Sequence, residues 1–238
     1  MTLYRDHGIV LRTHKLGEAD RIVAFYTAGH GKVRAVAKGV RKTHSKFGAR
    51  LEPTSHVAAQ FYEGRTLDLV TQVETVDQFR TLRDDLDRFA RASAMLEAVD
   101  QISDDAPPSV ALYQLLLRAL RTLSARASML VVSGFFWKLL ALEGLRPVVD
   151  RCVRCGVDDD LVAFDLEEGG VLCRGCRRGT AVSPPAVLLL QQILGGQLGV
   201  ALDAPDSPAS HEVELLATRA LEHHLERRLR SFGVLEQA

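Results

Sequence analysis

The feature that most constrains the fold of this chain is a change in the spacing of its apolar residues near residue 80. Before this point, short runs rich in β-branched and aromatic residues alternate with glycine-containing polar turns, which is the pattern of β-hairpins. After it, apolar residues recur three and four positions apart, which is typical of amphipathic helices. The switch predicts an α+β multidomain protein, with a β domain first and a helical domain after it.

Five runs in the first part of the chain are predicted to be strands. They cover residues 8–13, 20–27, 32–38, 55–62 and 66–76, and a polar turn is expected at 14–19. Five short strands favour a small closed barrel, and the OB-fold is the commonest barrel of this size that binds nucleic acid. An SH3-like barrel would give almost the same pattern. We therefore predict a five-stranded OB-fold β-barrel over residues 1–78.

Residues 79–238 are predicted to form an α-helical domain, whose apolar stripes are expected to be core. The first two stripes are Leu82, Leu86, Phe89, Ser93 and Leu96, and Leu112, Leu115, Leu116, Ala119 and Leu123. A further helix is expected over 128–143, and another from the cap Ser183-Pro184 to Gly195-Gly196. A loop is expected over 202–210, and the last helix carries Val213, Leu216, Ala217, Ala220 and Leu225.

All four cysteines fall in two matched pairs, Cys152 with Cys155 and Cys173 with Cys176. Two residues separate the members of each pair, and this double C-x2-C pattern is typical of a zinc site. Four thiolates fill the tetrahedral shell of the ion, whereas catalytic zinc keeps one position for water. We therefore predict one structural zinc ion in a four-cysteine zinc finger over residues 150–178, inserted in the helical domain. A redox C-x-x-C pair is the alternative interpretation.

Basic residues are concentrated at the start of the chain. Residues 1–50 hold eleven Lys or Arg and three acidic residues, or about +8, although the whole chain balances 30 basic against 30 acidic residues. Such asymmetry indicates a nucleic-acid or anionic partner, or else a solvated charged face. Period-two alternation places Lys32, Arg34 and Lys38 on one strand face. The predicted DNA-binding residues are Lys32, Arg34, Lys38, Arg41, Lys42, Lys46 and Arg50.

The motifs of common enzyme classes are missing. The chain has no phosphate-binding G-x-x-x-x-G-K-[ST] loop, no H-E-x-x-H and no G-x-S-x-G, so we do not expect an enzyme. The longest uncharged apolar run, 127–137, is about half of the ~20 residues that span a bilayer. With no secretory signal at its N-terminus either, the protein is expected to be cytoplasmic and not associated with a membrane.

The order of these features resembles one family, the bacterial RecO proteins. The matching segments are Gly17-Glu18-Ala19-Asp20-Arg21-Ile22-Val23, Tyr26-Thr27, Gly31, Ala37-Lys38-Gly39-Val40-Arg41-Lys42, Phe47 and Leu51-Glu52-Pro53. The helical domain with its C-x2-C…C-x2-C finger is similar to that of the members that retain zinc. The similarity covers nearly the whole chain and is weakest in the C-terminal helices.

The resemblance implies a mediator of recombinational DNA repair. Proteins of this family bind single- and double-stranded DNA, anneal complementary strands, and act with RecR, in some organisms also RecF, to place RecA on DNA coated by single-strand-binding protein. Contact with the acidic C-terminal tail of that protein is a further implied property. Because the aromatic fraction is only 6%, binding is expected to depend on phosphate contacts more than on stacking. The candidate stacking residues are Phe25, Tyr26, Phe47, Phe61 and Tyr62.

Two other kinds of protein fit the same features. One is a zinc-ribbon and OB-fold factor of transcription or translation, and the other is a zinc-stabilised scaffold whose basic face is only solvated. The finger is also basic, since it carries Arg151, Arg154, Arg174, Arg177 and Arg178. These arginines either contact phosphate or solvate the finger, and the sequence favours neither.

Overall fold

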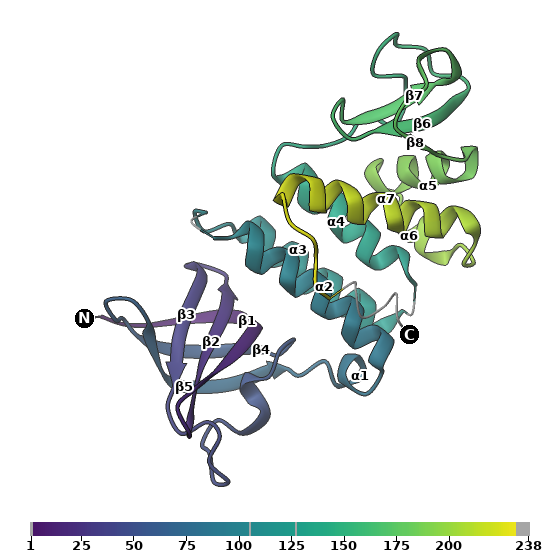
Figure 1. Ribbon diagram of the computed structural model, residues 1–238. Helices are drawn as coiled ribbons and strands as arrows, with labels where there is room; N and C mark the ends of the chain where they lie inside the picture. Colours follow the sequence, from purple (N-terminus) through teal and green to yellow (C-terminus); the bar gives the residue numbers. More distant parts are fainter. Residues whose placement is uncertain (1, 105, 127, 232–238) are drawn as a thin grey trace. The chain divides into compact units, whose positions relative to one another are not determined.

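A computed structural model describes residues 2–104, 106–126 and 128–231. The chain divides into two compact units, one formed by residues 1–125 with 229–238 and the other by residues 126–228. Over the described residues, the first unit contains a β-barrel and three α-helices, and the second contains four α-helices and a small sheet (Figure 1).

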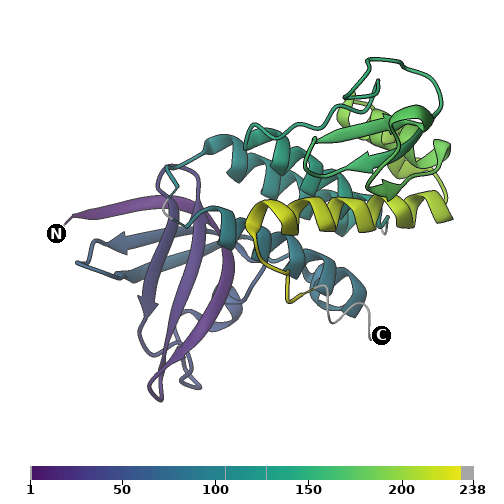
Figure 2. The same ribbon diagram turned by 45° about the horizontal axis from the view of Figure 1, so that its top comes forward.

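The barrel of the first unit closes in the strand order β1-β2-β3-β5-β4, in which β3 and β5 are parallel and the other neighbours antiparallel. Its strands are β1 (Leu3–Leu16), β2 (Asp20–Thr27), β3 (Gly31–Ala37), β4 (His56–Tyr62) and β5 (Asp68–Asp77). The predicted five-stranded, OB-like barrel is thus confirmed. In both ribbon views the segment between β3 and β4 extends from one end of the barrel (Figure 1, Figure 2).

The first strand is longer than the predicted run 8–13, and the turn expected at 14–19 is shorter. The physical reason is that β1 pairs with two strands: residues 3–9 lie beside β4, and residues 8–16 lie beside β2. A register shift between Val10 and Arg12 occurs where the strand passes from one neighbour to the other. Such bulges bend a strand and let it follow the curve of a barrel.

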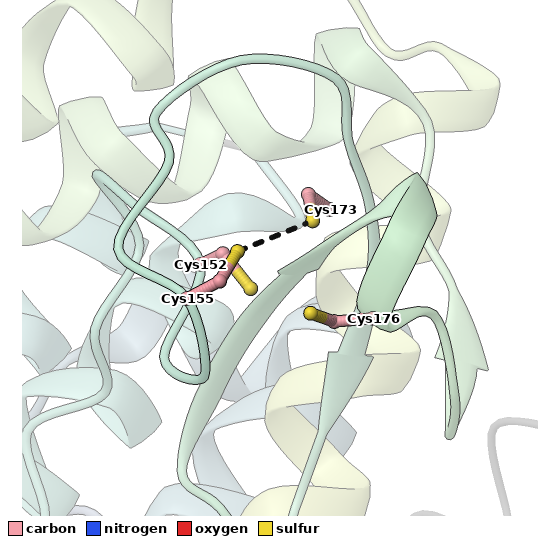
Figure 3. A group of neighbouring side chains, drawn as sticks. All are labelled: Cys152, Cys155, Cys173 and Cys176. Carbon is pink, nitrogen blue, oxygen red and sulfur yellow. Dashed lines mark hydrogen bonds between the residues drawn. The ribbon is translucent and has the colours of Figure 1, made fainter.

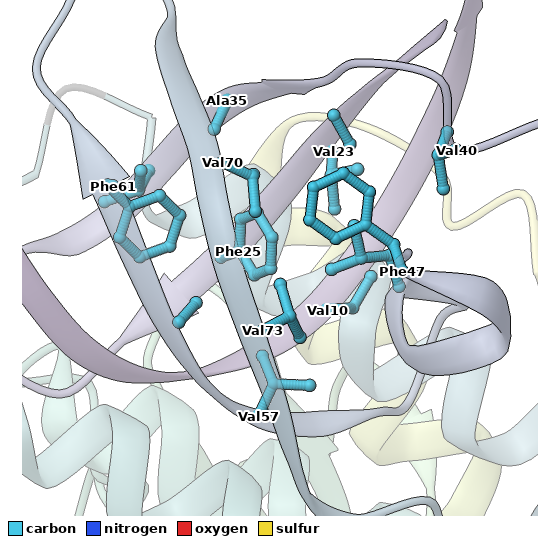
Figure 4. Packing of buried hydrophobic residues seen from close by; sticks show 14 residues of the cluster. Val10, Val23, Phe25, Ala35, Val40, Phe47, Val57, Phe61, Val70 and Val73 are labelled. Carbon is cyan, nitrogen blue, oxygen red and sulfur yellow. The ribbon is translucent and has the colours of Figure 1, made fainter. Parts of the chain in front are cut away.

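Apolar side chains from all five strands fill the barrel. Phe25 and Phe61 meet edge to face, with ring centroids 5.3 Å apart (Figure 4). Phe47 closes one end of the core from the segment between β3 and β4, just before the short helix η1 (Gly48–Leu51). Alternate strand residues reach this core, as period two requires: Val33, Ala35 and Ala37 in β3 are all buried.

Three helices complete the first unit, and α2 contacts β1, β2 and α3. They are α1 (Arg80–Arg83), α2 (Leu86–Ile102) and α3 (Val110–Ala125). Asp85 caps α2 by accepting a hydrogen bond from the Arg88 N–H. The expectation that the whole first stripe is core is wrong at Leu86, which is 74% exposed. It is the first residue of its helix, where the predicted period already holds but most of the side chain remains in solvent.

The second unit packs α4 against α5, α6 and α7 beside a three-stranded sheet of order β7-β6-β8. The elements are α4 (Leu130–Leu142), β6 (Leu161–Asp165), β7 (Gly170–Cys173), η2 (Arg174–Cys176), β8 (Thr180–Ala181), α5 (Pro184–Leu194), α6 (Leu198–Asp203) and α7 (Pro208–Leu225). The cap predicted at Ser183 is present, and its side chain accepts from the Ala186 N–H.

The loop expected over 202–210 is wrong at both of its ends, because α6 continues to Asp203 and α7 begins at Pro208. Ser207 caps α7 and Pro208 takes its first position. This is the same cap-and-proline signal that correctly located α5. Of the residues expected on one face of the last helix, Val213, Leu216, Ala217 and Ala220 are buried. Over the described residues, no helix is both long and apolar enough to cross a membrane.

Candidate metal centre and nucleic-acid interface

The four cysteines come together from two turns at the open end of the β6–β7 hairpin. In the first turn the Gly156 N–H donates to the Cys152 carbonyl, and Gly156 adopts a φ of +78° that favours glycine. In the second turn Cys173 ends β7, and the helix η2 carries the chain to Cys176. Each turn directs two sulfur atoms toward the other pair, as Figure 3 shows.

The spacing of the sulfur atoms fits a tetrahedral metal ion. All four Sγ atoms lie within 4.8 Å of one another, and those of Cys155 and Cys173 are 3.6 Å apart. With Zn–S bonds of about 2.3 Å, neighbouring sulfurs of a regular tetrahedron lie about 3.8 Å apart. The four cysteines can therefore bind one metal ion, and the donor set is consistent with zinc.

The pKa values of these thiols are displaced in both directions. Burial raises the pKa of Cys152, but backbone hydrogen bonds from Cys173, Cys155 and Arg154 outweigh it, and the value is lowered to about 6. Hydrogen bonding to Cys155, followed by burial, raises the pKa of Cys176 to about 12. The Cys152 thiol thus ionises easily, whereas the Cys176 thiol does not ionise readily beside another negative charge. A bound dication would stabilise both thiolates.

Most arginines of the finger are engaged in ion pairs within the finger itself. Arg154 and Arg178 both contact Glu168, each at 2.7 Å, and Arg178 also contacts Asp165 at 2.5 Å. Arg174 pairs with Asp160 at 2.6 Å. Of the two interpretations of these arginines, this pairing favours the one in which they solvate and brace the finger.

A different arrangement holds in the segment between β3 and β4, which we call the basic loop, residues 38–50. It contains Lys38, Arg41, Lys42, Lys46 and Arg50, and no Asp or Glu. All five of these side chains are exposed. Arg41, Lys46 and Arg50 donate hydrogen bonds to backbone carbonyls, those of Gly17, Thr71 and Lys46 respectively. Among the residues that the structure describes, no carboxylate forms an ion pair with these cations.

The basic loop is held against the barrel at its start and near its end. At its start the Gly39 N–H donates to Asp20 and the Arg41 N–H donates to the Ala19 carbonyl. Near its end Phe47 is buried in the barrel core, and the Lys46 ammonium lies 4.9 Å from the Phe47 ring centroid. The loop thus presents its cations from a fixed path over one end of the barrel.

The residues that follow the basic loop are fixed by Arg83, a residue that sequence reasoning missed. Its guanidinium donates to the carbonyls of Glu52 and Pro53 and to the hydroxyls of Thr54 and Ser55. Burial lowers the pKa of Arg83. No local signal in the sequence links Arg83 to residues 52–55, because the contact depends on where α1 lies.

Six of the seven predicted DNA-binding residues are exposed, namely Arg34, Lys38, Arg41, Lys42, Lys46 and Arg50. Lys32 is different, because its side chain is only 8% exposed. Its ammonium contacts Asp100 at 2.7 Å and Asp104 at 2.5 Å, and Asp100 also pairs with Arg12 at 2.6 Å. Lys32 lies on the predicted strand face, but α2 covers that end of the face. The carboxylates that contact Lys32 come from Asp100 in α2 and from Asp104 just after it.

The candidate stacking residues are distributed unequally between core and surface. Phe25, Tyr26, Phe47 and Phe61 are each at most 1% exposed, whereas Tyr62 is 40% exposed. Only Tyr62 of these five therefore has a ring face that a nucleic-acid base could reach.

Two family models match the chain in succession. A model described as recombination protein O, N terminal, matches residues 1–79, and one described as recombination protein O, C terminal, matches residues 83–232. The first covers the barrel, and the second covers α2 and the elements after it, including all four cysteines.

Proposed function

The chain belongs to the recombination protein O family, whose members act in DNA repair by recombination and bind DNA, and from that premise we propose its activity in detail. It binds single- and double-stranded DNA, anneals complementary strands and, with RecR, helps to load RecA onto DNA coated by single-strand-binding protein. This work would take place on the DNA of the cytoplasmic nucleoid. RecF and the acidic tail of single-strand-binding protein are the further partners of the proposal.

The observation that carries the proposal is the uncompensated charge of the basic loop. Within the described part of the chain, none of the six exposed DNA-binding candidates forms an ion pair with a carboxylate. Lysine and arginine side chains displace condensed counterions from a phosphate backbone, which gives affinity without sequence preference. The loop is thus suited to phosphate contacts along a strand.

Annealing follows from the same charges. Two complementary strands repel each other through their phosphates, and a surface that neutralises both lowers this repulsion without any need for ATP. No group of the barrel has to react for this to happen. The proposed activity therefore requires charge at fixed positions, which the attached basic loop supplies.

In this proposal the metal ion is structural zinc. Cys152, Cys155, Cys173 and Cys176 would hold it, and it would supply the bonds that tie the two turns of the finger together. Trp137 of α4 lies beside Phe164 of β6, with ring centroids 5.7 Å apart. The finger thus packs on the helices of its own unit, and a zinc ion would stabilise that packing.

The test is strand annealing measured with complementary oligonucleotides that carry a fluorophore and a quencher. The double variant Arg41→Ala/Lys42→Ala should anneal several-fold more slowly than the wild type. Arg227→Ala/Arg228→Ala is the matched control, since it removes an adjacent pair of exposed cations elsewhere and should anneal normally. Equal rates for the two variants, or binding restricted to one sequence, would contradict the proposal.

A further inference from the structure

An unbroken row of apolar side chains crosses the outer surface of the barrel, and we call it the apolar belt. Its members are cross-strand neighbours: Ile22 pairs with Val36, Val36 with Leu69, Leu69 with Tyr62, and Tyr62 with Leu3. The belt therefore visits β2, β3, β5, β4 and β1 in turn. Five strands spaced by about 4.8 Å make it about 19 Å long.

The belt faces away from the core and remains accessible. Phe61 and Val70 point into the barrel in Figure 4, so their strand neighbours Tyr62 and Leu69 point outward. Leu3 is 55% and Tyr62 40% exposed, and the other three members are half-buried. Elsewhere on the outer face, Lys32 contacts Asp100 of α2 and Tyr26 contacts Ser109, just before α3.

Cations lie along the belt where it crosses β3 and β5. Arg34 is two residues before Val36, hence on the same face and about 7 Å from it along the strand, and Lys38 directly follows the end of β3 at Ala37. The Lys46 ammonium donates to the carbonyl of Thr71, two residues after Leu69 in β5. Each of these three cations is exposed and free of carboxylates in the described structure.

Another cation lies where the belt crosses β4 and β1. Arg5 is two residues from Leu3, and its guanidinium donates to the side chain of Gln60 at 3.0 Å. Gln60 is in turn two residues from Tyr62 on the same face. Exposed cations thus lie beside the apolar row where it crosses β3, β5, β4 and β1.

This combination fits an unpaired polynucleotide strand, which presents flat apolar bases and regularly spaced phosphates. A protein partner fits less well, because an apolar row one residue wide is far smaller than the roughly 800 Å² that each side of a stable protein interface buries. We propose that the unpaired bases of single-stranded DNA lie on the apolar belt, with one base stacked on Tyr62, while the flanking cations contact the phosphates. The inference rests on the proposed function and adds a base contact to it.

The consequence is a distinction between single and double strands. In a duplex the bases are stacked inside and cannot reach Tyr62, so only the phosphate contacts are available. Stacking on an aromatic side chain contributes, by alanine substitution, an amount equivalent to about 5- to 150-fold in affinity per base. The belt should therefore favour single strands by that factor while leaving the charge contacts common to both.

The experiment compares three fluorescent ligands of equal length: oligo(dT), the same strand with abasic sites throughout, and a duplex. Tyr62→Ala should weaken binding of oligo(dT) by about 5- to 150-fold and leave the other two ligands within about twofold. Tyr62→Phe keeps the ring and should behave like the wild type. Arg34→Ala should weaken all three ligands, and circular dichroism melts confirm that each variant is folded.

Each contrary outcome has one meaning. If Tyr62→Ala binds oligo(dT) as well as the wild type does, or weakens all three ligands equally, the belt contacts no bases and the inference is wrong. If that variant binds every DNA normally but loses RecR, the belt is a protein surface, and the inference is likewise wrong. If the wild type itself binds none of the ligands, it is the proposed function that fails.

Discussion

Lys32 and Arg34 are two residues apart on the same face of β3, yet we expect opposite consequences when each is replaced. Lys32 is buried against Asp100 and Asp104, whereas Arg34 is exposed. Replacement of Lys32 should therefore reduce stability and leave the electrostatics of DNA binding intact. Replacement of Arg34 should leave stability unchanged and weaken the electrostatic part of DNA binding. Each variant is therefore the control for the other.

The cost of Lys32→Met follows from what the substitution leaves behind. Removing one partner of a buried ion pair typically costs about 3–5 kcal/mol, because the other charge stays buried and unpaired. Here Asp100, whose side chain is 11% exposed, keeps Arg12 at 2.6 Å. We therefore expect a smaller loss of about 2–3 kcal/mol, which corresponds to a fall in melting temperature on the order of 10 °C.

For Arg34→Ala the free energy of unfolding should change by less than about 0.5 kcal/mol, as is usual for exposed positions. Its effect should appear in the salt dependence of DNA binding. Each lost phosphate contact reduces the slope of log affinity against log salt by about 0.7 on single strands. Urea unfolding and fluorescence anisotropy at several salt concentrations measure both quantities. The reasoning is refuted if Lys32→Met flattens the salt slope while the stability is unchanged.

Two further predictions concern stability. Zinc chelation, or the substitution Cys155→Ser, should lower the melting temperature of the second unit by more than about 10 °C. Either change should also shift the fluorescence emission of Trp137, which lies beside Phe164. An unchanged melting temperature and an unchanged emission would exclude a structural metal. Burial, followed by the charge of Arg121, lowers the pKa of His56 to about 4. Between about pH 6.5 and pH 4, His56 therefore takes up a proton in the unfolded chain but not in the folded protein. The free energy of unfolding should thus be highest above about pH 6.5 and fall by about 2 kcal/mol on acidification to about pH 5, as urea unfolding would show. A fall of the same size in His56→Gln would contradict this assignment.

The cluster of four cysteines was predictable from the sequence because its signal is local. Two cysteines in one turn can face one ion whatever the rest of the chain does, and only the return of the second pair to the first depends on the fold. The hairpin β6–β7 provides that return. The five-stranded barrel was predictable for a similar reason, since period two is a property of each strand alone.

The contacts made between distant segments were not predictable. Alternation correctly assigned Lys32 to the outer face of its strand, but Asp100, which neutralises it, lies in α2. Arg83 fixes residues 52–55 through the position of α1, and no periodicity encodes that contact. The apolar belt depends on the register of five strands at once, and a shift of one residue in any strand would break it.

The measurement that tests the central claim most directly is the salt dependence of single-strand binding by the wild type and by Arg41→Ala/Lys42→Ala. If about four phosphates contact the protein, log affinity should fall with log salt at a slope near about −3, and loss of two contacts should bring the slope to about −1.5. Weakening should be similar for all sequences. A wild-type affinity that does not change with salt, or an unchanged slope in the variant, would contradict the claim that the basic loop binds the phosphate backbone.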